Sequence, residues 1–587
     1  MHPENSSRHR GSLHRSPNPA CAWSGAVPLI FVVAQLTLLI ALPARATTDA
    51  GALQQQFERE RELSRPLPGR VLPDTSAPAE SVSPKRGSAL QVRGFLFSGN
   101  TVIGSDALSA VLEPYRQRPL EFAEIEALTL VLSAHYRAQG YVVQVALPAQ
   151  DVSDGVLGFV VTEAVLGQVL VDARTPVRTS RERLTGIVAN QLREGEILQV
   201  EALSRALLIA SDLPGLAVTG ALAQGEAPGQ TDLVLSVSDK PLMSGDVDLD
   251  NTGGTSTGTE RLGLNLYGNG VLGQGDLWSA NLSANQGSNY ARLSLTVPVG
   301  YGGLRLGLDA SRLEYQVLAT QYASLELHGA SSVQGVEAVY PLLRSQNQNL
   351  FLSAALGDKR FLNYSATKAV SDYASRVISW SLHGNRYDAL GGGGASSGNL
   401  TLSQGHLNLD ASATQAADAL STQTAGDYRK LRFALSRQQA LNEDLTLALS
   451  YSGQWTDQNL DSSEKFFLGG STGVRAYPSG EGAGALGRLA NAELRWRWSD
   501  TTALSVFYDT GSVTVNPRND YAGASALNSY GLEGAGLALA WSGERGVSAR
   551  LVWARRLGDN PNPSATGQDQ DGTLVRDRLW ASAQLAF

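Results

Sequence analysis

The sequence predicts a transmembrane β-barrel that follows a soluble α+β region. From Pro241 to Phe587, apolar and polar residues alternate in short segments, as in strands with one face toward lipid and one toward water. The chain holds 42% hydrophobic and only 17% charged residues, yet a single apolar run approaches the length of a membrane helix. At 587 residues it is too long for one ordinary core, so we expect two or more domains.

Residues 1–46 are predicted to be a signal peptide. The apolar run, Val27 to Pro43, follows a basic stretch and precedes Ala44-Arg45-Ala46, an A-x-A cleavage site. A signal anchor is the alternative, but Gln35 and Thr37 interrupt the run and small residues follow it. We therefore expect an exported protein.

Composition and spacing argue against several classes of function. The net charge is −8 and no segment clusters Lys and Arg, so we expect no nucleic-acid partner. The single cysteine, Cys21, lies in the predicted signal peptide, so the mature chain has no disulfide. The histidines that follow residue 46 lack a histidine or cysteine at ligand spacing; they are His135, His328, His383 and His406. We therefore expect no metal site and no cofactor.

Residues 47–87 are predicted to form a short amphipathic helix and a linker. Leu53, Phe57 and Glu60 fall at helical spacing within the segment from Gly51 to Leu63. Five prolines follow within residues 65–86, at Pro66, Pro68, Pro73, Pro78 and Pro84. A segment of this composition does not pack a core, so the helix is expected to be tethered rather than fixed.

Residues 88–164 and 165–240 are predicted to be two copies of one α+β module. The first contains the strand-like LQVRGFLF, two helices, and the strands YVVQVAL and VLGFVVTEA. Ser105 is expected to cap its first helix, and its second helix ends at Gly140. The apolar face of that second helix is formed by Ile125, Leu128, Leu132 and Tyr136. Residues 165–240 repeat this order of elements.

Residues 241–587 are predicted to form the barrel, with a wet and polar lumen. In the segment around Leu494, Trp496 and Trp498, the opposite strand face carries Glu493 and Arg495, which lipid would not tolerate. The last segment alternates up to the terminal aromatic residue, Phe587, which is typical of outer-membrane barrels and serves as their assembly signal. The expected location is the outer membrane, with the lipid bilayer around the barrel.

Sequence patterns of catalytic sites occur but lack the required context. Gly394 to Gly398 matches G-x-S-x-G without a strand before it or a helix after it, and we interpret it as a flexible surface loop. The G-x-G-x-x-G matches that begin at Gly268 and Gly482, and the similar glycine-rich GLEGAG that begins at Gly531, lack a βαβ unit and are interpreted as turn glycines. We expect no catalytic residues and no enzyme, although spacing alone does not exclude a triad.

Two short motifs near the end of the chain indicate an internal ion pair. Val474, Arg475, Ala476 and Tyr477 lie in a glycine-rich loop that is longer than a barrel turn needs. In the segment FYDTG, which contains Phe507, Asp509 and Gly511, the aspartate falls on an inward strand face. A carboxylate in that position favours a nearby cation, and Arg475 is the candidate.

These motifs resemble those of the two-partner secretion transporters, the haemolysin activation/secretion proteins of the ShlB/FhaC/HecB type, in the outer-membrane assembly superfamily that includes BamA. The resemblance covers nearly the whole mature chain, because QVRGFLFSGNTVI, DNTGG (Asp250 to Gly254), GVRAYPSGE and FYDTG occur in the family's order. It implies two POTRA domains, a pore-plugging leading helix and a barrel of sixteen strands. It also implies a loop folded into the lumen, whose Arg475 meets Asp509 on the barrel wall.

One residue departs from the family pattern. The loop tip reads V-R-A-Y, with Ala476 where the family has glycine. Alanine is poorer than glycine at positive φ, so either the turn is right-handed or the tip has a different shape.

The function implied by the resemblance is a non-enzymatic pore that exports a large haemolysin- or adhesin-like exoprotein from periplasm to cell surface. The partner would be recognised through its N-terminal secretion domain. An extended segment of it is expected to add to an edge strand of a module, with Val234 and Leu235 as trial edge positions. Periplasmic chaperones and the barrel-assembly machinery are the other expected partners.

Two other functions remain open at this point. A barrel-assembly factor of the BamA or TamA kind would use the same parts to insert other barrels. An enzyme displayed on a barrel would need a catalytic domain, and no segment before Pro241 is left unassigned to hold one.

Overall fold

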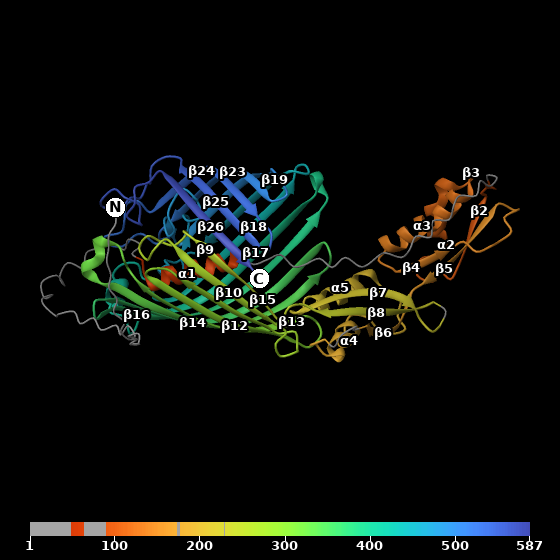
Figure 1. Ribbon diagram of the computed structural model, residues 1–587, viewed down its shortest axis with the longest axis horizontal. Coiled ribbons are helices and arrows are strands. Elements are labelled where there is room, and N and C mark those ends of the chain that lie inside the picture. Colours follow the sequence, from red (N-terminus) through yellow and green to blue (C-terminus); the bar gives the residue numbers. More distant parts are fainter. Residues whose placement is uncertain (1–47, 64–89, 173–176, 228) are drawn as a thin grey trace, which may run out of the picture. The chain divides into compact units, whose positions relative to one another are not determined.

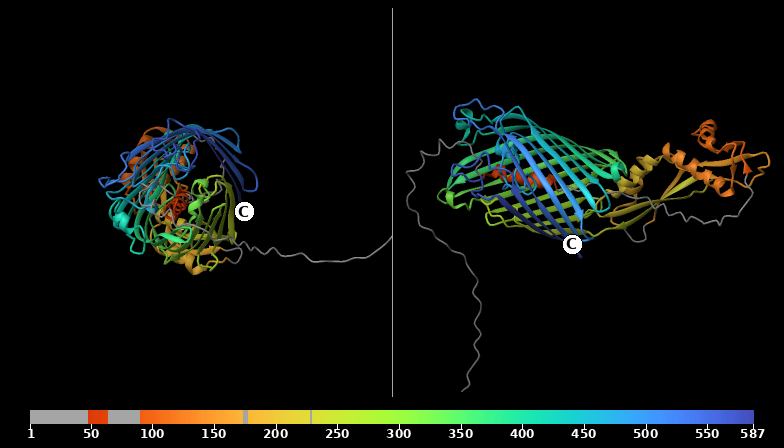
Figure 2. Two further views of the ribbon diagram at one scale, coloured as in Figure 1. Left: turned by 90° about the vertical axis from the view of Figure 1, so that its left-hand side faces the viewer. Right: turned by 90° about the horizontal axis from the view of Figure 1, so that it is seen from above.

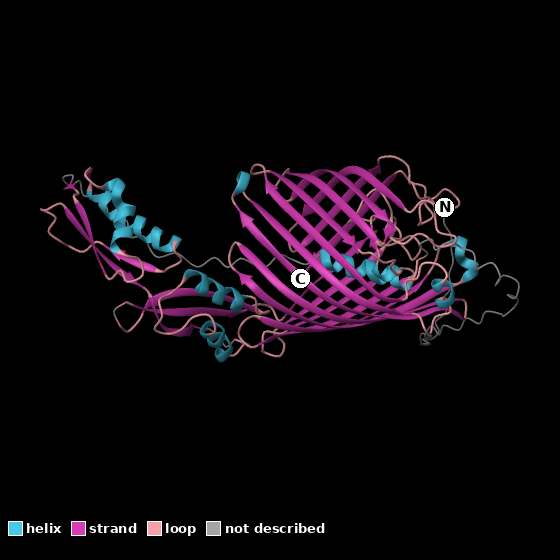
Figure 3. Cartoon of the chain, turned by 180° about the vertical axis from the view of Figure 1, so that it is seen from behind, coloured by secondary structure: helices cyan, strands magenta, loops and turns pink. Residues whose placement is uncertain are grey.

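The structure is a computed structural model that describes residues 48–63, 90–172, 177–227 and 229–587. The predicted signal peptide and the proline-rich part of the predicted linker lie outside the described residues. Among the residues described, no helix combines the length and the apolar character needed to cross a bilayer. Figure 1 labels the elements, and Figure 3 separates helices from strands by colour.

The first module, within residues 90–164, packs two helices on a small sheet. Its elements are β1 (Leu90–Gln91), β2 (Gly94–Ser98), α2 (Ser105–Leu112), η1 (Glu113–Tyr115), β3 (Pro119–Leu120), α3 (Phe122–Ala138), β4 (Val143–Ala146) and β5 (Val156–Glu163). The sheet order is β2-β5-β4, with β2 and β5 parallel. The four apolar residues predicted for α3 are all buried, so the helical period identified the core face correctly.

The predicted cap of α2 is wrong. Ser105 is the first residue of the helix, and Gly104 occupies the N-cap position without a side-chain hydrogen bond. The hydroxyl of Ser105 instead accepts a hydrogen bond of 3.1 Å from the Asn100 side-chain amide. The turn before the helix therefore uses the serine that the sequence suggested as a cap.

The second module repeats the strand–helix–helix–strand–strand order of β2, α2, α3, β4 and β5, with fewer elements in total. They are β6 (Val165–Asp172), α4 (Arg181–Ala189), α5 (Val200–Ser211), β7 (Leu216–Gln224) and β8 (Gln230–Asp239). Its sheet order is β6-β8-β7, so the last strand lies in the middle and the edges are β6 and β7.

The trial edge positions Val234 and Leu235 are therefore wrong, because both lie on the central strand β8. β8 pairs with β6 in parallel and with β7 in antiparallel orientation. It therefore has a neighbour on each side and offers no free edge. A central strand and an edge strand of a small sheet can carry the same apolar alternation, so the sequence did not separate them.

A closed barrel of sixteen antiparallel strands follows, as predicted. Its strands are β9 (Met243–Asp250), β10 (Arg261–Asn269), β11 (Leu277–Ala284), β12 (Ser288–Val299), β13 (Leu304–Gln316), β14 (Leu327–Arg344), β15 (Gln348–Ser365), β16 (Lys368–Asp388), β17 (Gly394–Asn408), β18 (Gly426–Ala440), β19 (Leu445–Trp455), β22 (Leu486–Arg497), β23 (Thr502–Thr514), β24 (Ser529–Ser542), β25 (Val547–Arg556) and β26 (Asp577–Ala586). Each strand pairs with the next, and β26 closes on β9 (Figure 1).

The predicted alternation of wall residues is present in the barrel. On β22, the outward Trp496 is 48% exposed, whereas the carboxylate of Glu493 on the opposite face is buried in the lumen. Closure satisfies the main-chain groups of the strands, so the wall needs no help from outside.

Two motifs expected in loops or turns lie inside barrel strands. Gly394 to Gly398, predicted to be a surface loop, begins β17 and pairs with β16 and β18. Of the presumed turn glycines, Gly268 lies in β10 and Gly531 in β24, while Gly482 lies in a loop at positive φ. Runs of small residues suggest loops in a sequence, but a barrel wall uses them where another segment approaches closely.

The longest connection of functional interest is the segment from residue 456 to residue 485, here called the inward loop. It joins β19 to β22 and carries η4 (Ser462–Glu464), β20 (Phe466–Phe467) and β21 (Ala483–Gly484). Before the modules, helix α1 (Ala50–Leu63) lies inside the ring of barrel strands (Figure 2).

We expect residues 241–587 alone to refold in detergent as a heat-modifiable barrel, because closure satisfies the backbone without the modules. Unboiled fragment should migrate faster in SDS gels than boiled fragment, with a β-type circular dichroism spectrum. Equal migration, or a helical spectrum, would contradict the autonomy of the barrel.

Candidate functional site

Helix α1 is bound in the lumen through its own side chains. Gln54 is buried and accepts a hydrogen bond of 2.9 Å from the Ser331 hydroxyl of β14. The ring of Phe57 stacks on Tyr290 of β12, with 4.4 Å between the ring centres. Polar and aromatic contacts therefore both hold the helix against the wall.

Three glutamates of α1 pair with three different strands of the wall. The pairs are Glu58 with Lys359 of β15 at 2.9 Å, Glu60 with Arg261 of β10 at 2.8 Å, and Glu62 with Arg432 of β18 at 3.3 Å. Residues two apart on a helix point about 200° apart, so Glu60 faces away from Glu58 and Glu62, which lie about one turn apart on the same face. We call these three pairs the mooring pairs.

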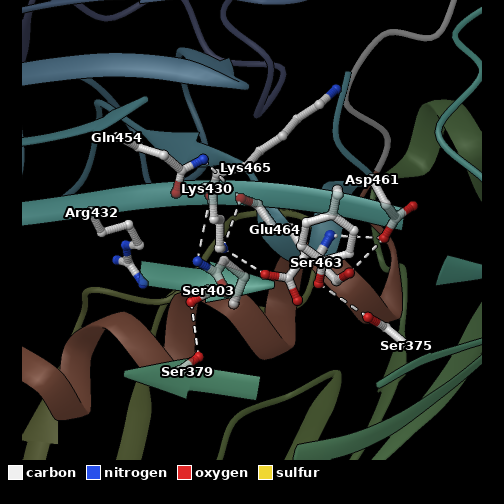
Figure 4. Close-up of polar contacts among 12 residues, drawn as sticks. Ser375, Ser379, Ser403, Lys430, Arg432, Gln454, Asp461, Ser463, Glu464 and Lys465 are labelled. Carbon is white, nitrogen blue, oxygen red and sulfur yellow. Dashed lines mark hydrogen bonds and ion pairs between the residues drawn. The ribbon is translucent and has the colours of Figure 1, made fainter. Parts of the chain in front are cut away.

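A buried ionic cluster links the helix to the inward loop. Figure 4 shows its contact between Glu464 and Lys430. Glu464 of η4 lies 2.5 Å from the Lys430 ammonium group and 3.3 Å from that of Lys359. Its main-chain oxygen accepts hydrogen bonds from Lys430 and from the side chain of Gln454. Burial opposes ionisation of Glu464, but the two lysines outweigh it and lower its pKa to about 2. Lys359 therefore bridges a carboxylate of the helix and one of the loop.

The structure brings Arg475 and Asp509 into direct contact. The Arg475 guanidinium donates two hydrogen bonds to the carboxylate, from Nε at 2.9 Å and from Nη2 at 2.8 Å. Its main-chain N–H donates a third, at 3.1 Å. Asp509 is fully buried, so this two-pronged contact is shielded from bulk water.

The remaining donors of Arg475 are also engaged. Its Nη1 donates to Glu493 of β22 at 2.7 Å, and its guanidinium carbon lies 3.4 Å from the ring centre of Phe507. Burial alone would lower the pKa of Arg475, but the bonds to Asp509 and Glu493 raise it. The main-chain oxygen accepts from the Trp580 indole at 2.7 Å. The arginine thus joins the loop tip to β22, β23 and β26.

The backbone of the loop tip shows how Ala476 replaces the glycine of the family pattern. The Tyr477 amide donates to the Val474 carbonyl at 3.0 Å, and Ala476 is not among the non-glycine residues at positive φ. The turn is therefore right-handed and accommodates alanine. A Cβ atom on Gly534 of β24 would lie 2.6 Å from the Ala476 methyl, so the wall glycine provides the space.

The other predicted residues also lie at close contacts. A Cβ atom on Gly511 would lie 2.6 Å from the side chain of Leu468 in the inward loop, so glycine permits this approach. The terminal residue, Phe587, exchanges two main-chain hydrogen bonds of 2.9 Å with Gly245 of β9. The last residue of the chain thus contributes to barrel closure.

Sequence reasoning missed several residues of this site. Alternation indicates Glu493 as a lumen charge but not as a partner of Arg475, and no pattern in the sequence singles out Gly534. Lys359 and Glu464 gave no signal, because residues more than 100 positions apart form that pair. Within the described ranges, no group of three or more His, Cys, Asp and Glu residues could hold a metal ion.

Comparison with known families identifies the family of the chain. A model of the haemolysin secretion/activation protein ShlB/FhaC/HecB matches residues 229–537, more than half of the chain. A model of the ShlB-type POTRA domain matches residues 90–164, the first module.

Known proteins resemble the chain over most of its length. The heme/hemopexin transporter protein HuxB of Haemophilus influenzae is 25% identical over 561 residues, which is 92% of this chain and 96% of that protein. The outer membrane transporter CdiB of Dickeya dadantii is 24% identical, over 85% and 86% of the two chains.

Solved structures share the fold. CdiB from Escherichia coli superposes with a TM-score of 0.64 at 20% identity, over 93% of this chain and 100% of that one. BamA from Haemophilus ducreyi lacking POTRA domains 1–3 gives 0.52 at 15% identity, over 86% and 100%. With a closed barrel, a ShlB-type POTRA domain and a matching family model, the chain belongs to the haemolysin secretion/activation protein ShlB/FhaC/HecB family, the two-partner secretion transporters of the outer membrane.

Proposed function

We propose that this transporter is a gated, non-enzymatic pore whose lumen conducts an unfolded exoprotein after helix α1 leaves it. The observation that supports this most strongly is the filling of the lumen. Helix α1 enters it from outside the barrel sequence and is held by side-chain contacts and by the Ala50 main-chain N–H, which donates to Asn363, rather than by strand pairing. A filling that is not part of the wall can leave without opening the barrel.

The mooring pairs suit a helix that must be released. Glu62 is 49% exposed and Glu60 is 34% exposed, so water screens these two pairs. Exposed ion pairs contribute only about 0–1 kcal/mol each, and water can solvate both partners after release. Glu58 is better buried, but Lys359 keeps Glu464 as a second partner when the helix is absent. The charge of Lys359 is therefore paired with a carboxylate both when the helix is seated and after it has left.

The inward loop is the part of the filling that stays connected to the wall. Its contact between Arg475 and Asp509 is buried. Water therefore does not screen this ion pair, in contrast to the two exposed mooring pairs. Removing one partner of a buried ion pair leaves the other charge uncompensated, which costs about 3–5 kcal/mol. We propose that this contact holds the loop tip in a conformation that export requires.

We further propose that the exoprotein first binds a module by strand addition at an exposed edge. In the second module, β7 is an edge strand, and the residues that follow Thr219 are mostly exposed. The named cargo classes of the relatives, heme/hemopexin and hemolysin, suggest a large secreted protein recognised through its N-terminal region. Periplasmic chaperones and the barrel-assembly machinery are proposed to act earlier, during insertion of the barrel.

An assembly factor of the BamA kind shares the barrel architecture, as the fold likeness shows. The relatives that match over most of this chain are named as transporters, which favours export.

The mooring pairs can be tested by electrophysiology. Glu58→Gln, Glu60→Gln and Glu62→Gln together should increase channel opening in planar bilayers, because at ~0.5 kcal/mol per pair the seated-to-released ratio falls roughly tenfold. Glu314→Gln, which breaks an outward exposed pair with Arg312, is the matched control. Wild-type open probability in the triple variant would place the helix outside the gating step.

The contact between Arg475 and Asp509 can be tested by a double-mutant cycle. Arg475→Lys and Asp509→Asn should each reduce export strongly while outer-membrane abundance stays near normal, because neither replacement restores the two-pronged ion pair. The losses should be coupled rather than additive in the double variant. Arg312→Ala serves as the control for loss of an exposed arginine. Additive losses, or normal export from Arg475→Lys, would remove the contact from the mechanism.

Strand addition can be tested with prolines on β7. In an antiparallel edge strand, neighbouring residues direct their N–H groups alternately inward and outward, so Ala221→Pro and Leu222→Pro probe the two directions. The variant that loses the outward donor should keep the module folded and lower export. Normal export from both variants would exclude β7 as the recognition edge.

A further inference from the structure

The seam of the barrel, where β26 meets β9, is shorter than the ladder on the other side of β26. β26 pairs with β25 through residues 577–585, but with β9 only through residues 582–586 (Figure 1). Residues 577–581 therefore continue past the end of the β9 ladder. Main-chain groups on that side of β26 need other partners.

The side chain of Asn251 supplies those partners. Its Oδ1 atom accepts a hydrogen bond of 2.8 Å from the Ala581 amide, and its Nδ2 atom donates one of 3.0 Å to the Leu579 carbonyl. Its own main-chain N–H donates to the Ala581 carbonyl at 3.2 Å. A carboxamide offers one acceptor and one donor in a plane, as a peptide group does, so Asn251 takes the place of a missing strand residue.

The residues on either side of Asn251 connect this turn to helix α1. Asp250 accepts two hydrogen bonds from the Arg261 guanidinium, at 3.1 and 3.2 Å. The Nη1 atom of Arg261 donates a hydrogen bond of 2.8 Å to Glu60 of the helix. The Nη2 atom of the same arginine also donates to the Thr252 hydroxyl, at 2.7 Å. One arginine therefore holds the turn on both sides of Asn251 and one mooring pair at the same time.

The same turn contacts both loops that border the seam. The Ser479 hydroxyl of the inward loop donates to the Thr252 carbonyl at 3.0 Å. The Thr255 hydroxyl donates to the Asp571 carbonyl, in the connection between β25 and β26, at 2.8 Å. These contacts make the DNTGG motif, Asp250 to Gly254, together with the following Thr255, a junction of helix, loop and seam.

We propose that this motif, here called the seam clasp, closes the seam above the β9 ladder and that its closure depends on a seated helix α1. Asn251 is the positioning residue of the clasp, and Arg261 transmits the position of Glu60 to Asp250. When the helix leaves, Arg261 loses an anion that holds its fork in place, and the turn that presents Asn251 becomes less constrained. Release of the helix therefore loosens the seam.

Hydrogen exchange of the full-length protein, measured residue by residue in nanodiscs without any substrate, tests the clasp. Asn251→Leu keeps the size of the side chain but removes both amide bonds, so the Ala581 amide should exchange on the order of tenfold faster. Asn251→Asp keeps the acceptor and should stay closer to wild type. Asn281→Leu, at a lumen amide within a continuous ladder, is the matched control. Wild-type protection of Ala581 in Asn251→Leu would overturn the clasp.

The dependence on the helix is tested by the same measurement on two helix variants. Glu60→Gln should speed exchange of the Ala581 amide, because Glu60 holds the Arg261 guanidinium, which in turn holds Asp250 next to Asn251. Glu62→Gln weakens the seating of the helix but leaves the contact between Glu60 and Arg261 in place, so it should speed this exchange less. Equal exchange in the two variants would overturn the dependence. Because no export is measured, failure here is distinguishable from failure of the proposed pore function.

Discussion

The lumen of the barrel is the constraint on which the rest of the structure depends. Sixteen strands satisfy one another's main-chain groups, but they enclose a polar space that the wall side chains do not fill. Helix α1 and the inward loop occupy it, and buried charges are paired between these segments and the wall, as in Glu464 with Lys430 and Arg475 with Asp509. The ionic contacts inside the barrel are therefore consequences of closing a wide sheet around two inserted segments.

The architecture was predictable from local pattern, whereas the contacts inside the lumen were only partly so. Alternation identified the barrel and the helical period identified the core face of α3, because both are properties of consecutive residues. Arg475 and Asp509 were paired with the help of a family resemblance. The bridge from Lys359 to Glu464 was not foreseeable, since the two residues meet only after the barrel closes. The position of β8 between β6 and β7 is likewise a matter of topology.

The contacts of the two inserted segments differ in how water reaches them. Two of the mooring pairs are partly exposed, so their loss is compensated by hydration. The Arg475 contact is buried and reinforced by Glu493, Phe507 and the Trp580 indole. The same barrel thus holds helix α1, whose ion pairs water can replace, and the inward loop, whose ion pair water cannot replace. Both segments use pairs between a basic side chain and a carboxylate.

The fit of Ala476 against Gly534 has a consequence for comparing related transporters. The space between the loop tip and the wall holds one methyl group, which Ala476 of the loop supplies and Gly534 of β24 leaves room for. These two residues lie 58 positions apart in the chain. A methyl group gained on one side requires an empty position on the other. The loop is therefore not a transferable unit by itself: a chimaera that exchanges it between family members must exchange the facing wall residue as well.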